Sequence, residues 1–112
     1  MAVKVRRERP DQRRHHRVTA PMFVTVNGIR HRAADWSLGG LRVEAFPGDI
    51  PKQLDKLDLT LTLPFQGFDV TFEAKAEVVR ANAETRGFAV RFLELGERER
   101  EVMGHFLEEL VR

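Results

Sequence analysis

One short segment combines side chains that could bind a polar ligand. Residues 35–40 fit the pattern Asp/Asn-x-Ser-x-x-Gly, and Ser37 is the only serine in the chain. Shuffled sequences of this composition would contain the pattern about once in two hundred cases. Because side chains alternate along a strand, a hydrogen-bond acceptor at Asp35 and a hydroxyl at Ser37 would share one face. The same residue types also cap turns, so the segment alone leaves both interpretations open.

A second cluster of polar residues lies near the N-terminus. Arg13 and Arg17 form an Arg-x-x-x-Arg pair, and Arg9 with Arg13 forms an overlapping one. With 15 arginines in the chain, about two such pairs are expected by chance, so this spacing alone is uninformative. Seven basic and two acidic side chains give residues 1–17 a charge of +5, which leaves −3 on the rest. Such a basic arm binds an anion or is a solvated tail.

Beyond residue 17, apolar residues mostly alternate with polar ones, which is typical of antiparallel strands around one core. Asn27-Gly28 predicts a type I′ hairpin turn between the first two strands. Breaks at 47–49, at Pro64 with Gly67, and at 82–87 separate the later strands. The sequence predicts six strands, whose approximate ranges are 22–26, 29–34, 41–45, 57–63, 68–78 and 88–92.

Helical spacing replaces this alternation near the C-terminus. Apolar residues then recur as in an amphipathic helix, at Val102, Met103, Phe106, Leu107, Leu110 and Val111. We therefore predict an all-β protein with one C-terminal helix: a flexible basic arm over 1–17, a six-stranded antiparallel β-barrel over 18–95, and a helix over 96–112. The helix would pack on the barrel or on a partner, which could be a second copy of the chain.

Taken together, these features resemble the PilZ domain family. The resemblance rests on Arg-x-x-x-Arg near the N-terminus, a β-hairpin, and then Asp-x-Ser-x-x-Gly before a third strand. It extends through the final strand at 87–92 and the C-terminal helix. The resemblance implies a bacterial receptor for the second messenger cyclic di-GMP, acting on exopolysaccharide synthesis or motility through an unidentified downstream protein.

The resemblance also implies a set of ligand-binding residues, namely Arg13, Arg14, Arg17, Asp35, Ser37, Gly39 and Gly40, with Arg9 and His16 as secondary contacts. Guanidinium groups can pair with guanine O6 and N7 or with phosphate. Asp35 could accept bonds from guanine N1–H and N2–H₂, and Ser37 could donate to a phosphate oxygen. Gly39 is expected to be a turn residue with positive φ, and Gly40 to permit close backbone approach. Trp36, facing the other way, is expected in the core, with base stacking as the alternative.

Other functions have less support. The chain has no cysteine and no cluster of residues with metal-ligand spacing, and nothing suggests an oriented catalytic triad. We therefore expect no enzyme activity, no metal and no cofactor beyond the ligand. Because the chain has no apolar run of about 20 residues, we do not expect it to insert into a membrane. We expect it to be located in the cytoplasm. The alternatives are a small β-barrel that binds single-stranded nucleic acid, and a ligand-free PilZ-fold interaction module.

Overall fold

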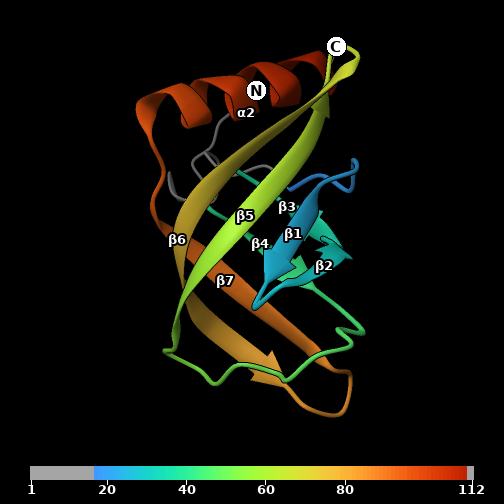
Figure 1. Ribbon diagram of the computed structural model, residues 1–112, viewed down its shortest axis with the longest axis vertical. Coiled ribbons are helices and arrows are strands. Elements are labelled where there is room, and N and C mark those ends of the chain that lie inside the picture. The colour runs from blue at the N-terminus through green and yellow to red at the C-terminus, as the bar shows by residue number, and fades with distance from the viewer. Residues whose placement is uncertain (1–16, 111–112) are drawn as a thin grey trace, which may run out of the picture.

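The computed structural model describes residues 17–110, which form one strongly curled sheet and a helix (Figure 1). The elements follow one another along the chain as β1 (Phe23–Val26), β2 (Ile29–Arg32), β3 (Asp35–Trp36), β4 (Gly40–Val43), β5 (Lys56–Phe65), β6 (Phe68–Asn82), β7 (Gly87–Glu94) and α2 (Glu97–Leu110). This arrangement confirms the prediction of an all-β fold with a C-terminal helix.

All neighbouring strands in the sheet are antiparallel, and their order is β2-β1-β5-β6-β7-β4-β3. The predicted count of six is wrong, because the chain bends after β2 and Asp35–Trp36 pairs with β4 as a separate short strand. Within the described residues, the outermost strands β2 and β3 share no ladder. The sheet is therefore a half-barrel and not a closed barrel.

Two hairpins follow the turn chemistry of their residues. Asn27 and Gly28 between β1 and β2 have φ angles of 50° and 81°, as the predicted type I′ turn requires. Gln66 and Gly67 between β5 and β6 have φ angles of 53° and 85°. Pro64 was expected to mark this second turn but lies inside β5. It is tolerated there because pairing of β5 with β1 extends only to Thr62.

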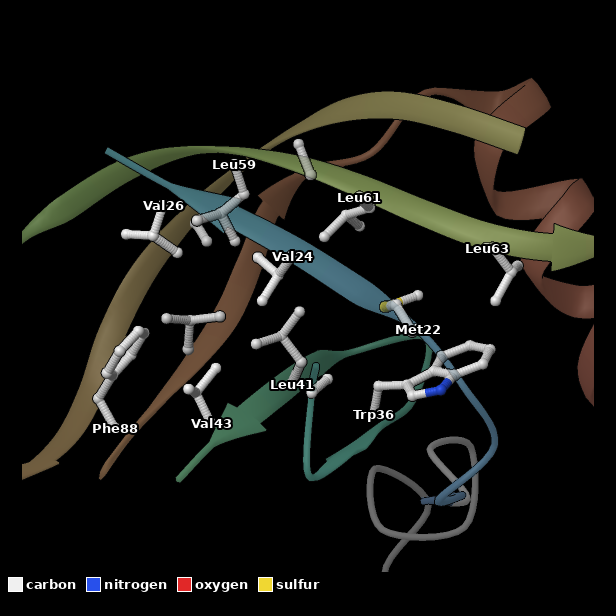
Figure 2. Close-up of a cluster of buried hydrophobic side chains, with 14 of the residues drawn as sticks. Met22, Val24, Val26, Trp36, Leu41, Val43, Leu59, Leu61, Leu63 and Phe88 are labelled. Atoms are coloured by element: carbon white, nitrogen blue, oxygen red, sulfur yellow. The ribbon is translucent and has the colours of Figure 1, made fainter. Parts of the chain in front are cut away.

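The core fills the concave side of the sheet. Alternate residues of the strands point inward, and Figure 2 shows Trp36 near one end of this cluster and Phe88 near the other. Helix α2 lies across one end of the half-barrel, close to the β5–β6 turn (Figure 1). Its Met103 is fully buried, and its Phe106 ring lies 5.6 Å from the Trp36 ring and 6.2 Å from the Phe65 ring. The helix thus packs on the sheet by the face that the sequence predicts.

Candidate functional site

Asp35 stands at the centre of a cluster of charged side chains on the outer face of β3 and β4. Arg17 donates from Nη1 to Oδ1 of Asp35 at 2.6 Å. Arg42, which is the partner of Asp35 in the β3–β4 ladder, donates from Nε to Oδ2 at 2.9 Å. The Asp35 side chain is only 15% exposed, whereas that of Arg17 is 50% exposed. Both carboxylate oxygens are therefore engaged, and Arg17 can be reached from solvent.

Glu44 extends this cluster by pairing with Arg42. The hydrogen bond to Glu44, followed by that to Asp35, raises the pKa of the Arg42 guanidinium above its ordinary value. Arg42 therefore stays charged and holds the Asp35 side chain in place. Sequence reasoning missed Arg42, although Leu41 and Val43 on either side are core residues whose alternation already directs Arg42 outward.

Ser37 lies in the tight loop between β3 and β4 and is 2% exposed. Its backbone N–H donates to the carbonyl of Gly40 at 2.8 Å, and its Oγ accepts from the N–H of Gly39 at 3.1 Å. Through this local bond Ser37 caps the turn, which is one of the two roles that the sequence pattern left open. The hydroxyl hydrogen is not used in that bond, so Ser37 retains the capacity to donate.

The two glycines of the motif are explained by the packing of this loop on β7. Gly39 was expected to have positive φ, and this is wrong, because the positive-φ glycines among the described residues are Gly28 and Gly67. The Gly39 carbonyl instead accepts from the N–H of Phe92 at 2.8 Å. A Cβ on Gly40 would lie 2.0 Å from the carbonyl oxygen of Val90. Gly40 does permit a close backbone approach, and the backbone that approaches is that of β7.

Trp36 anchors the motif from the inside. Its side chain is fully buried, and its Nε1 donates to the carbonyl of Ala20 at 2.8 Å. The backbone of Trp36 also exchanges two hydrogen bonds with Val18, at 2.9 and 3.0 Å. These bonds fix the chain next to Arg17 against β3. The expectation that Trp36 belongs to the core is confirmed by its burial.

Five of the predicted site residues lie in the described part of the chain. Arg17 contacts Asp35, and Ser37, Gly39 and Gly40 follow in the turn from β3 into β4. The remaining predicted residues, Arg9, Arg13, Arg14 and His16, lie outside the described residues.

Across 17–110, no group of three His, Asp or Glu side chains is placed to hold a metal ion. Within the same stretch, no helix is both long enough and apolar enough to cross a membrane.

The PilZ domain family model matches residues 4–109 of the sequence, and the chain belongs to this family. No curated protein sequence matches it. Among solved structures, the chain is similar to the inhibitor of motility MotI/DgrA from Bacillus subtilis, with 20% identity and a TM-score of 0.75 over 89% of this chain. It is also similar to YcgR from Escherichia coli in complex with c-di-GMP, with 20% identity and a TM-score of 0.65 over 90% of this chain.

A third similar structure is the PilZ domain of CeSA from a cellulose-synthesizing bacterium, with 16% identity and a TM-score of 0.58 over 87% of this chain. The chain covers 99% of that isolated domain. By contrast, it spans about half the length of the two longer neighbours, 51% of MotI/DgrA and 46% of YcgR. At these identities the likeness shows the shared fold.

Proposed function

We propose that this chain is a receptor for cyclic di-GMP that changes its conformation or its partner contacts when the ligand binds. The contact between Arg17 and Asp35 carries the proposal. It joins the last residue of Arg-x-x-x-Arg to the first residue of Asp-x-Ser-x-x-Gly, two patterns far apart in the sequence. Membership of the PilZ family and the fold shared with c-di-GMP-bound YcgR support it.

The residues at this site match the groups that the ligand presents. Cyclic di-GMP offers two phosphates and two guanines on a rigid ring. Arg17 can donate to a phosphate or to guanine O6 and N7, and Asp35 can accept from guanine N1–H and N2–H₂. Ser37 can give its unused hydroxyl hydrogen to a phosphate oxygen. Arg13 would hold the other side of the ligand, with Arg14 and Gly39 beside it and Arg9 and His16 as secondary contacts.

Ligand binding would exchange one set of contacts for another. Arg17 is half exposed, so water screens its attraction to Asp35 and the pair is weaker than a fully buried one. A hydrogen bond to a charged ligand group contributes about 1.5–3 kcal/mol. Arg17 can therefore leave Asp35 for the ligand at a net gain. Arg42 keeps Asp35 in place during the exchange.

Calorimetric titration tests the proposal. We expect cyclic di-GMP to bind with a Kd of about 1 μM or lower, close to −8 kcal/mol, and GTP and single-stranded DNA to bind far more weakly. Arg17→Ala and Asp35→Ala should each weaken binding at least about tenfold, which corresponds to 1.4 kcal/mol. Arg98→Ala removes an equivalent charge from the exposed side of α2 and should have no effect. Equal binding of all three ligands would favour the nucleic-acid alternative, and no binding at all would favour the ligand-free interaction module.

The downstream step belongs to the same proposal. A change at Arg17 would alter the surface shown to a partner protein, or to a second copy of this chain in a homodimer. We propose that the partner belongs to motility or exopolysaccharide control and that the chain acts in the cytoplasm by binding alone, without catalysis.

A further inference from the structure

A groove runs along the outer face of β7, beside the proposed ligand site. Its floor is made of small residues, Gly87 and Ala89, on the middle strand of three. Longer side chains form its walls. Arg42 on β4 and Glu44 just after β4 form one wall, and Arg80 and Asn82 on β6 form the other. The groove has a volume of about 110 Å³. A single water needs roughly 10–15 Å³ on such a measure, so the groove has room for the edge of a planar base.

Arg80 reaches this groove because of an irregularity in β6. Ala74, Ala76 and Val78 face the core, so a regular strand would point Arg80 inward as well. A register shift between Val78 and Arg80 places Arg80 opposite Ala89, on the outer face. The N–H of Leu54 donates to the Val78 carbonyl at 2.7 Å and fixes the strand there. Bulges of this kind often redirect a side chain next to a binding site.

The groove is continuous with the cluster around Asp35. In the sheet register, Asp35 pairs with Arg42, Arg42 with Ala89, and Ala89 with Arg80. These four residues therefore form one row across four strands. At about 4.8 Å per strand, the row is roughly 14 Å long. Arg42 belongs both to the Asp35 cluster and to the groove, so a ligand bound at Asp35 would have the groove within reach.

The chemistry of the walls identifies what the groove can recognise. Arg80 makes no ion pair with any residue from 17 to 110, so its guanidinium is available to donate two parallel bonds to O6 and N7 of guanine. Glu44 is 58% exposed on the opposite wall and can accept from N1–H and N2–H₂. Adenine presents an amine donor where guanine presents the acceptor O6, so in adenine a donor would face the donors of Arg80.

We infer that this groove is a guanine-recognition subsite, in which Arg80 binds O6 and N7 and Glu44 binds N1–H and N2–H₂. The inference rests on the proposed function, because it assigns one guanine of cyclic di-GMP to the groove. It makes Arg80 and Glu44 specificity-determining residues in addition to those of the two sequence patterns. The flat floor of Gly87 and Ala89 leaves space for the base.

Titration of Arg80 variants with cyclic di-GMP and cyclic di-AMP tests the assignment. Arg80→Ala should weaken cyclic di-GMP binding at least about tenfold and leave the weak cyclic di-AMP binding unchanged. Arg80→Lys, which keeps the charge but loses the two parallel donors, should recover only part of the affinity. Arg98→Ala is the charge-matched control and should bind as wild type. Unchanged melting temperatures would show that the variants are folded.

The outcomes separate the groove from the proposed function. If Arg80→Ala binds cyclic di-GMP as wild type while Arg17→Ala has lost it, the groove assignment is wrong and the receptor function stands. Full recovery of binding in Arg80→Lys would show that charge alone acts there, which would also overturn the assignment.

A second measurement does not depend on the cyclic dinucleotide. In NMR titrations with millimolar 5′-GMP or 5′-AMP, the backbone amides of Glu44, Arg80 and Ala89 should shift saturably with 5′-GMP only. If they do so while cyclic di-GMP fails to bind, the subsite stands and the proposed function fails. If neither nucleotide moves these amides, the subsite is overturned.

Discussion

Adding one methyl group at Gly40 should destabilise the whole half-barrel. The Cβ of Gly40→Ala would lie 2.0 Å from the carbonyl oxygen of Val90 and 3.0 Å from the Cα of Arg91. Both atoms belong to the backbone of β7, so no side-chain rotation can relieve the contact. Overpacking in a core lowers the unfolding free energy by about 1–3 kcal/mol. Because the neighbour of Gly40 is rigid backbone, we expect Gly40→Ala to cost about 3 kcal/mol or more. At about 4–8 °C per kcal/mol for a domain of this size, we expect the melting temperature to fall by at least about 12 °C.

The same substitution at Gly104 is the matched control. Gly104 lies inside α2, and a Cβ there would meet no atom within 4 Å. Gly104→Ala should therefore raise the stability by up to about 1 kcal/mol, or about 4–8 °C, because alanine is the better helix former. Thermal melts followed by circular dichroism would measure both changes. If the Gly40→Ala protein had the same melting temperature as the wild type, the close approach of β4 to β7 would be refuted. Loss of ligand binding in this variant would report an altered fold, and not a lost ligand contact.

Two further predictions concern the core and an ion pair. Trp36→Ala should lower the unfolding free energy in urea by about 3–5 kcal/mol, because it empties a fully buried site; a variant of normal stability that loses only the ligand would show that the indole stacks on a base. The pKa of Glu77 lies below its ordinary value of 4.5, chiefly because Arg91 donates hydrogen bonds to its carboxylate. The ionised Glu77 therefore stabilises the folded state fully above pH 4.5. This stabilisation is lost as the pH falls through the lower pKa of the folded state. The melting-temperature advantage of wild type over Glu77→Gln should therefore shrink between about pH 6 and pH 3, and an advantage independent of pH would contradict this assignment.

Much of the fold could be predicted because local sequence and tertiary packing agree. Alternating residues in β5, β6 and β7 leave one apolar face each, and Asn27-Gly28 specifies its turn directly. The irregularities could not be predicted in this way. The separate strand β3 depends on pairing with β4, and the bulge before Arg80 depends on a hydrogen bond from the distant residue Leu54. The bulge arises from a contact between segments far apart in the sequence, and β3 is too short to show the alternation that marks the longer strands.

In the candidate site, too, some residues could be predicted from local sequence and others could not. Asp35 and Ser37 belong to a pattern rare enough to stand out, and Arg17 could be chosen only because that pattern is present. The roles of the glycines were harder to foresee. Gly40 is required by the proximity of β7, whose sequence position gives no hint of it. Arg42 and Arg80 resemble any other exposed arginine until the register of the sheet places them in one row with Asp35.

The strand order also has a consequence for how the molecule folds. Strands β5, β6 and β7 are consecutive, so their meander needs only the closure of short loops. By contrast, β1 must find β5, and β4 must find β7, across long stretches of chain. Non-local pairings form slowly because the entropy of closing a long loop is lost before the contact is made. The loop from Ser37 to Gly40 is joined to β7 by the hydrogen bond from the N–H of Phe92 to the Gly39 carbonyl, which can form only when β4 has docked. A nascent chain would thus acquire its ligand motif late, after the C-terminal half that supports it.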